Sequence, residues 1–327
     1  MCIRDRYLCD KKKGGTMKLV LSLNSKKFIY DYVDIGVEYF VVGAKYFSCR
    51  QALSLEYDEI ANLKKVLGDK KVWVLVNALV EEKYIDFLEK HLIRLSHIGV
   101  DGILFQDFGV LQICNEHNFD FEMIYHPDTL NTNQATLNYL GTQGINGAFL
   151  AREIPLEEKK IIAKNVNVKT MIQVHGVEYM AYSKRKLLTN YFKEINQDIP
   201  IGISDDLTIQ ANGVNYSCHI YEDQYGCHIL SKQQMCGLDI MSSFQDFDYL
   251  YIESLYVDEL KLVEIVNLYQ DALISVGNRT YGKVAKELIS QLYQLDPNIE
   301  YHHSFMFDAT VYKIDDVRKR EENEKCK

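Results

Sequence analysis

The chain has 327 residues, of which 47% are apolar and 25% charged, and its formal net charge is −9 at neutral pH. This length allows one large α/β domain with additions, or two modest domains. The acidic balance argues against nonspecific nucleic-acid binding, which needs many Lys and Arg side chains, although a local basic patch can still dock a structured RNA. No apolar run approaches the length of a membrane span and no signal peptide is recognisable, so we expect a cytoplasmic protein without a membrane segment.

Eight cysteines are scattered along the chain, which favours reduced thiols over a disulfide framework. Cys218, Cys227 and Cys236 recur at equal intervals, and a histidine follows each of the first two. This spacing is unlike the CxxC pairs of zinc sites, so we predict no metal site there. Residues 1–16 are polar and charged, and we expect them to be disordered or foreign to the natural protein.

Short apolar, β-branched or aromatic runs alternate with longer amphipathic segments, a pattern typical of βαβ units and a parallel sheet. Amphipathic segments at 57–67, 82–95 and 133–140 have the apolar spacing of helices. Eight runs with helices between them predict an eight-stranded β/α barrel of the TIM type. The predicted strands are 19–23, 39–42, 72–77, 102–106, 121–126, 147–150, 169–175 and 248–253.

A long interval separates the seventh and eighth predicted strands and exceeds what one crossover helix needs. We therefore predict an inserted subdomain at 177–247, with a mobile loop at 196–215 and a hairpin across 216–230 that turns near 222–226. The other predicted parts are a barrel of 17–176 and 248–275, helices at 257–273 and 283–293, a strand near 306–312, a C-terminal extension at 276–327 and a frayed tail from Asp315.

In a β/α barrel, the polar residues at the carboxyl ends of the strands converge on one open mouth. Here these residues are Asn77, Gln106 with Asp107, His126 with Asp128, Arg152 with Glu153, His175 and Glu253. Our substrate-binding candidates are Arg152, Asn77, His126 and Asp128, and our catalytic candidates are His175, Glu153 and Glu253.

Each candidate also has a structural interpretation. Neighbouring strand residues point to opposite faces, so only one of Arg152 and Glu153 can face the mouth, and a guanidinium there would suit a carboxylate or phosphate. For Asn77 and Gln106, a hydrogen bond to a loop carbonyl is the favoured role. For His175, a structural role and an acid, base or binding role are equally open. Glu253 ends an apolar strand, where a charge needs a partner, which favours a role in the mouth.

A basic segment follows the seventh predicted strand and contains Lys184, Arg185 and Lys186. It is either a solvated helix start or a contact for RNA phosphates, and the first interpretation is the commoner one for a run of charges. The chain contains none of the GxSxG, HExxH, Walker or GxGxxG motifs, so it shows no standard protease or nucleotide-binding machinery.

The run from His175-Gly176 through Ser183-Lys-Arg to Asn190-Tyr-Phe resembles peptidase family U32, a collagenase-like group, and in particular its compact branch. The match covers most of the chain from Met17 to Tyr312. Further matching stretches are Asn77-Ala78, His126-Pro-Asp-Thr-Leu-Asn-Thr-Asn133, Leu150-Ala-Arg-Glu153, Ile220-Tyr-Glu-Asp-Gln-Tyr-Gly226, Cys236-Gly-Leu-Asp239 and Tyr251-Ile-Glu253.

The resemblance implies a β/α barrel that takes part in hydroxylation of RNA or of a quinone precursor rather than in proteolysis. The compact branch resembles proteins that make 5-hydroxyuridine at the wobble position of tRNA, with prephenate as a required metabolite. The expected partner is therefore tRNA, and Arg152 would suit a dicarboxylate such as prephenate.

Many members of this family bind a four-iron-four-sulfur cluster through cysteines at positions that are Tyr179 and Lys186 here. A phenol and an amine do not replace thiolates on such a cluster, so we predict no cofactor at that place. Hydroxylation then needs another source of oxidising power, and a longer, cluster-bearing paralogue is the expected partner subunit.

Two other functions stay open at this point. In a peptidase, His175 with Glu153 or Glu253 would activate water, and a divalent metal held by His126, His175 and a carboxylate would support that alternative. In a purely structural binding protein, the polar residues of the mouth would be satisfied by their own loops.

Overall fold

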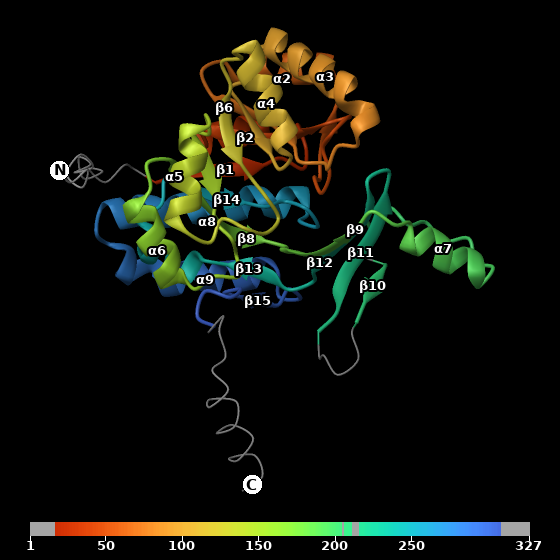
Figure 1. The fold of residues 1–327 in the computed structure, drawn as a ribbon. Coiled ribbons are helices and arrows are strands. Elements are labelled where there is room, and N and C mark those ends of the chain that lie inside the picture. The colour runs from red at the N-terminus through yellow and green to blue at the C-terminus, as the bar shows by residue number, and fades with distance from the viewer. Residues whose placement is uncertain (1–16, 205, 211–215, 309–327) are drawn as a thin grey trace, which may run out of the picture.

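The computed structural model describes residues 17–204, 206–210 and 216–308, which form a barrel with a smaller sheet projecting from one side (Figure 1). The predictions for residues 1–16 and for the tail from Asp315 fall outside the described residues. So do residue 205 and residues 211–215 of the loop that was expected to be mobile.

Eight parallel strands of the described residues close into a barrel in the order β14-β1-β2-β4-β5-β6-β7-β8, and β8 completes the ring by pairing with β14. Each of the eight predicted barrel strands is present within two residues of its expected bounds, so the predicted eight-stranded β/α barrel is confirmed. The strands are β1 Lys18–Ser22, β2 Tyr39–Ala44, β4 Lys71–Val76, β5 Gly102–Phe105, β6 Glu122–Tyr125, β7 Gly147–Phe149, β8 Lys169–Gly176 and β14 Tyr249–Ile252.

Helices follow the barrel strands and lie around the outside of the ring (Figure 1). The helix α2 begins with a capping box, in which Glu56 and Glu59 satisfy each other's backbone N–H groups, and it has the predicted bounds. The helices are α1 Ile29–Ile35, α2 Tyr57–Leu67, α3 Ile85–Ile98 after the short turn η1 Glu82–Tyr84, α4 Phe108–His117, α5 Gln134–Thr142, α6 Leu156–Asn165 and α8 Glu259–Gly277.

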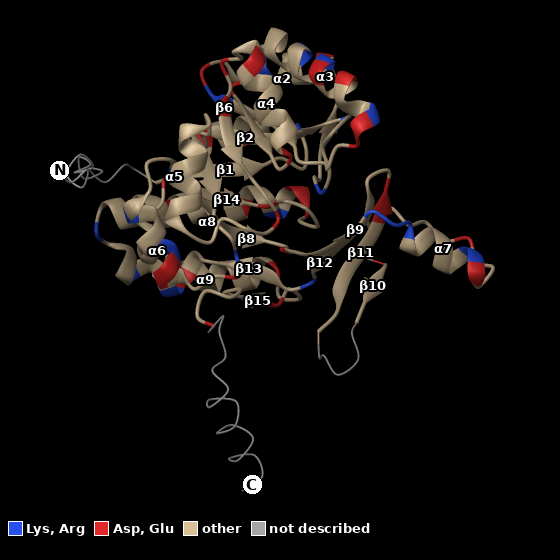
Figure 2. Cartoon of the chain, in the orientation of Figure 1, with Lys and Arg blue, Asp and Glu red and all other residues tan. Residues whose placement is uncertain are grey.

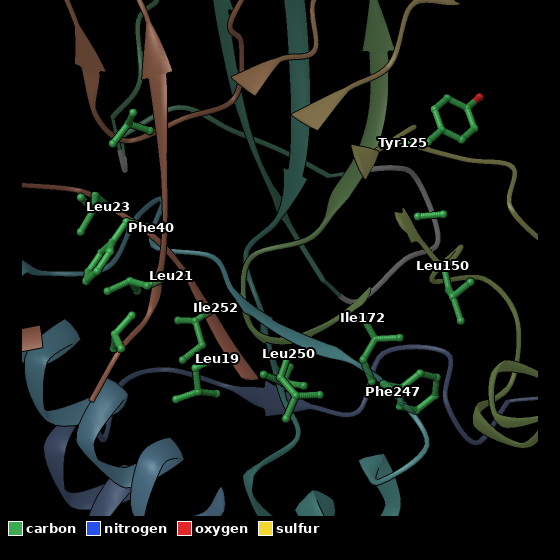
Figure 3. Packing of buried hydrophobic residues seen from close by; sticks show 14 of the residues in the cluster. Leu19, Leu21, Leu23, Phe40, Tyr125, Leu150, Ile172, Phe247, Leu250 and Ile252 are labelled. Carbon is green, nitrogen blue, oxygen red and sulfur yellow. The ribbon is translucent and has the colours of Figure 1, made fainter. Parts of the chain in front are cut away.

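Alternation along each strand divides the core into two parts. Leu19 and Leu21 of β1 point outward into the layer between strands and helices, which Figure 3 shows, whereas Val20 between them points into the barrel. Inside the barrel, Tyr39, Trp73 and Tyr249 pack edge to face with ring centroids 4.9 to 5.1 Å apart. These rings fill the amino-terminal half of the barrel, and the polar residues lie toward the other end.

The interval between β8 and β14 builds a second, antiparallel sheet with the order β10-β11-β12-β9. The predicted hairpin is β11 and β12, which turn at residues 223–226. The later part of the interval returns to the barrel, where β13 pairs antiparallel with β8. The elements are β9 Tyr179–Ser183, α7 Leu187–Glu194, β10 Thr208–Ile209, β11 Cys218–Asp223, β12 Gly226–Ser231, β13 Gln234–Cys236 and η2 Leu238–Phe244.

After the barrel, α9 (Tyr281–Leu295) packs against α8 and η2. The position predicted for the final strand, near 306–312, is wrong. The structure has this strand at β15, Tyr301–His302, which pairs with β13. Met306 lies in a turn, and its side chain is buried. Residues 309–312 are outside the described residues. A short β3 (Ser54–Leu55) pairs with the end of β2. None of the helices in the described ranges is long and apolar enough to cross a bilayer.

Candidate anion-binding site at the barrel mouth

A pocket opens at the carboxyl ends of the barrel strands, on the side where the second sheet approaches. Its cavity measures about 60 Å³, which is room for a carboxylate group and a few waters rather than for a whole ring. Its polar lining consists of Arg50, Asn77, His126, Asp128, Arg152, Gln173, Tyr179 and Glu253. The structure therefore brings together five of the residues predicted from strand ends, namely Asn77, His126, Asp128, Arg152 and Glu253.

An ion pair between Arg50 and Asp128 forms one wall of this pocket. Nη2 of Arg50 lies 2.9 Å from both carboxylate oxygens of Asp128, and it also donates to the amide oxygen of Gln106 at 3.3 Å. The two charged side chains are only 8% and 12% exposed, so each depends on the other for compensation of its charge. Sequence reasoning missed Arg50, because it lies in the loop after β2 rather than at a strand end.

The loop that carries Arg50 is fixed by hydrogen bonds to β4. The Asn77 amide accepts from the Cys49 N–H at 2.9 Å and donates to the Cys49 carbonyl at 3.0 Å. Ser48 accepts from the Ala44 N–H and donates to the Leu75 carbonyl. Asn77 thus makes the hydrogen bonds to a loop that were expected from the sequence. These bonds fix the backbone of Cys49, the residue before Arg50.

The second sheet reaches the same arginine through a buried histidine. Nη1 of Arg50 lies 3.4 Å from Nδ1 of His228, whose Nε2 lies 3.0 Å from Asp223. Because an arginine only donates, Nδ1 of His228 accepts the hydrogen bond from Arg50, and its Nε2–H donates a hydrogen bond to the Asp223 carboxylate. The network Asp223–His228–Arg50–Asp128 therefore links the hairpin to the barrel mouth.

Arg152 differs from Arg50 because its guanidinium has no ion pair or hydrogen bond within the described residues. The guanidiniums of both arginines lie over the ring of Tyr179, each with its central carbon 5.0 Å from the ring centroid. Burial lowers the pKa of Arg152, but an arginine keeps its charge at neutral pH. Glu178, Glu153 and Asp128 act on its charge from a distance without pairing with it. The pocket therefore offers a half-buried cation without a direct partner among the described residues, with the fork geometry that suits a carboxylate.

Glu253 lies at the end of β14 across the pocket. Its carboxylate accepts from the N–H groups of Ser254 and Leu255 and from the Tyr251 hydroxyl, yet burial raises its pKa. Gly176 makes this position possible, because its φ is +97° and a Cβ there would lie 2.3 Å from the Glu253 carbonyl oxygen. The backbone conformation and the nearby Glu253 carbonyl therefore explain why a glycine follows His175.

His126 lines the pocket as a neutral imidazole. Its ring packs edge to face on Phe149 at 4.5 Å, and its Nδ1 is buried without a partner in the described part of the chain. Burial, together with the charges of Arg50 and Arg152, lowers the pKa of His126 to about 3. It can therefore hydrogen-bond a ligand without adding charge.

His175 does not face this mouth, which contradicts its expected catalytic role. Its ring packs against Tyr269 and Tyr301, both ring nitrogens lack a partner among the described residues, and burial lowers its pKa to about 3. The reason is a bulge: Gln173 pairs with Tyr251, but the next pair is His175 with Ile252, so β8 contains one extra residue. Gln173 precedes the bulge and faces the pocket by ordinary alternation with Met171, whereas the bulge turns His175 toward the outer core.

Glu153 does not line the pocket either, which is a second departure from the catalytic candidates. Its neighbour Arg152 does, but both residues lie in the turn after β7, so the alternation of faces expected for a strand does not apply to them. His126 lines the pocket and His175 lies in the outer core, so the two histidines are in different regions. No group of three His, Cys, Asp or Glu among the described residues could hold a metal. The peptidase alternative that required both histidines has no assembled site here.

The basic residues Lys184, Arg185 and Lys186 are exposed between β9 and α7, and Figure 2 shows them as a blue stretch that leads into the helix. Lys184 forms an ion pair of 2.9 Å with Glu81 of the barrel. They are placed at the rim, outside the pocket itself.

The residues at the two family cluster positions do not fit an iron–sulfur cluster. The Tyr179 ring lies beneath two guanidiniums and Lys186 is exposed, so neither soft sulfur nor an arrangement of ligands is present at these positions. The geometry instead offers anion binding next to a carboxyl group of raised pKa.

The fold and this site define a β/α-barrel protein with two arginine side chains at its mouth. The chain belongs to peptidase family U32, since the profile of that family matches residues 25–314. It is 28% identical to the tRNA hydroxylation protein P2 of Bacillus subtilis over 305 residues, which covers 90% of this chain and 99% of the relative.

Other similarities cover less of the molecules or are structurally weaker. The tRNA hydroxylation protein P of Escherichia coli is 29% identical over 126 residues, which is 38% of this chain and 28% of that protein. A solved structure of a U32 peptidase superposes with a TM-score of 0.46 at 14% identity, covering 75% of this chain and 94% of that one.

Proposed function

We propose that this protein takes part in the 5-hydroxylation of the wobble uridine of tRNA. The relative that matches it over nearly its whole length is named a tRNA hydroxylation protein. The observation that carries the proposal is the Arg152 guanidinium in the barrel mouth, which has no direct ion pair among the described residues and lies over the Tyr179 ring.

In this proposal, Arg152 binds the carboxylate end of a small metabolite, for which the dicarboxylate prephenate is the candidate. His126 hydrogen-bonds the ligand as a neutral group, and Glu253 faces it as a carboxyl group that can hold a proton because its pKa is raised. Asp128 and Asn77 act through Arg50, the first by charge and the second by clamping its loop.

Lys184, Arg185 and Lys186 contact tRNA phosphates in this proposal. The oxidising power comes from elsewhere, because the residues at the family cluster positions do not fit a cluster. A longer paralogue that carries the cluster would supply it, and this chain would present the metabolite and the RNA.

The test is nucleoside mass spectrometry of bulk tRNA from the native host, or from its nearest culturable relative, with and without this gene. We expect 5-hydroxyuridine and its derivatives to disappear with the gene and to return on complementation. An unchanged profile would contradict the proposal.

The same assay tests the site. Complementation with Arg152→Ala should fail, because the carboxylate loses its only free cation in the pocket within the described residues. The matched control is Arg94→Ala, because Arg94 also lies over a tyrosine ring, that of Tyr57, but is exposed on α3. If the Arg152→Ala gene restores 5-hydroxyuridine, Arg152 does not bind the metabolite and this part of the proposal is wrong.

A further inference from the structure

A second hollow lies beside the mouth and is lined mainly by aromatic residues. Its walls come from the loops after β2 and β4, from the start of α3 and from the hairpin turn between β11 and β12. We call it the aromatic groove, and it consists of Tyr46, Phe47, Leu79, Val80, Glu81, Tyr84, Phe87, Lys184, Gln224 and Tyr225.

The groove combines open aromatic faces with a fixed floor. Tyr84 and Phe87 are 46% and 40% exposed although they are large apolar side chains. The buried Phe47 supports Phe87 at 5.3 Å, and its N–H donates to the Tyr225 hydroxyl at 2.6 Å. Tyr182 in turn donates to the Tyr225 carbonyl, so the barrel loop and the hairpin hold each other in place.

Basic side chains lie along one edge of the groove in a chain that is acidic as a whole. The amine of Lys83 lies 4.8 Å from the centre of the Tyr84 ring, and Glu81 pairs with both Lys83 and Lys184 at 2.9 Å. Arg185 and Lys186 continue the basic edge away from Lys184. Flat aromatic surface beside a row of cations suits a group that is planar on one side and anionic on the other.

A narrow crevice joins the groove to the mouth pocket. It shares Arg50, Asn77 and Asp128 with the pocket, and Leu79 and Tyr225 with the groove. The groove measures about 290 Å³ against about 60 Å³ for the pocket, so a planar ring fits the groove and not the pocket in this structure. The groove and the anion site therefore lie on either side of this crevice.

We propose that the aromatic groove binds a single nucleobase of the RNA, turned out of its stack, with its phosphates on Lys184, Arg185 and Lys186. This inference rests on the proposed function and specifies where the RNA is held. Enzymes that modify a base inside a folded nucleic acid need such an extruded base, and aromatic side chains stabilise it by stacking.

The test measures the affinity of the full chain for two fluorescent anticodon stem-loop RNAs by anisotropy. One RNA has uridine at the first anticodon position, and the other has an abasic ribose there. We expect the wild-type chain to bind the uridine RNA about tenfold more tightly, since stacking of one base contributes roughly five- to a hundredfold. Phe87→Ala should remove this difference, and Phe87→Trp should keep it.

The matched control is Tyr139→Ala, because Tyr139 is a 63% exposed aromatic residue on α5 and does not line the groove. It should keep the tenfold difference. If Phe87→Ala also keeps it, or if wild type does not distinguish the two RNAs, the groove is not the base site although RNA binding stands. If wild type binds neither RNA, both this inference and the proposed function are overturned.

Discussion

Two histidines of this barrel lie at the carboxyl ends of parallel strands and have the same low pKa, yet they belong to different regions. His126 follows β6 and lines the mouth pocket beside two arginines, whereas His175 ends β8 and packs between Tyr269 and Tyr301 in the outer core. A position at the end of a strand therefore determines at which end of the barrel a side chain lies. Whether the side chain points into the barrel or outward depends on the local register of the strand. His126 should therefore contribute to binding, whereas His175 should contribute only to stability.

The largest expected effect concerns the ion pair within the mouth. Arg50→Ala leaves Asp128 buried without its partner and should lower the free energy of unfolding by about 3–5 kcal/mol. Urea denaturation followed by circular dichroism measures this loss. The double variant Arg50→Met, Asp128→Leu should recover most of it, and a loss under about 1 kcal/mol in the single variant would show that the pair is not buried in solution.

The next effect concerns the junction between the two regions. Gly176→Ala should cost about 2–4 kcal/mol, because alanine disfavours a positive φ and its Cβ meets the Glu253 carbonyl. Gly68→Ala is a suitable control, since φ there is also positive but a Cβ has open space. Equal losses of unfolding free energy in the two variants would show that the contact with the Glu253 carbonyl contributes nothing to the cost.

A pH effect distinguishes the histidine of the core from an ordinary exposed one. The pKa of His175 is about 3 in the folded chain and about 6.5 when unfolded, so its contribution to stability is complete above pH 6.5 and is lost as the pH falls toward 3. His175→Phe should reduce this acid loss by about 1.4 kcal/mol per pH unit between roughly pH 5.5 and 4.

Unfolding curves at several pH values test this slope. His126→Phe should flatten the acid limb in a similar way, because its pKa is equally low. Only the His126 variant should also lose binding of a dicarboxylate, measured by calorimetry. If His175→Phe also loses dicarboxylate binding, His175 takes part in the binding site and its placement in the outer core is contradicted.

The smallest expected effect is on the stability of the Arg152 variant. Arg152→Ala breaks no ion pair within the described residues and should change the free energy of unfolding by less than about 1 kcal/mol. The same denaturation assay serves, with Arg50→Ala as the comparison. A loss as large as that of Arg50→Ala would mean that Arg152 has a structural partner and is not a free anion site.

The residues found from the sequence and those missed differ in how they reach the mouth. Asn77, His126, Asp128, Arg152 and Glu253 were predictable because they directly follow buried strands, and the barrel rule brings strand ends together. Arg50 is eight residues beyond the predicted end of its strand. The one available signal was that this strand, unlike most of the others, had no polar residue assigned to its end.

His228 could not be predicted as a contact of the mouth, because it lies in the inserted sheet. Its register against β9 and β11 decides that its ring points to Arg50, and the approach of that sheet to the barrel is a tertiary feature. The aromatic groove has the same origin, since its walls come from four separate segments.

The sequence by itself determined the eight strands, the hairpin and the end of the barrel where polar groups gather. Alternating apolar patterns and turn residues act locally, so they can be recognised without knowing the fold. Only the tertiary structure decided that His175 turns away through a bulge in β8, that Arg50 takes Asp128 as its partner, and that Arg152 has no direct ion pair among the described residues. These outcomes depend on pairing between distant segments, in which one extra residue reverses the face of a side chain.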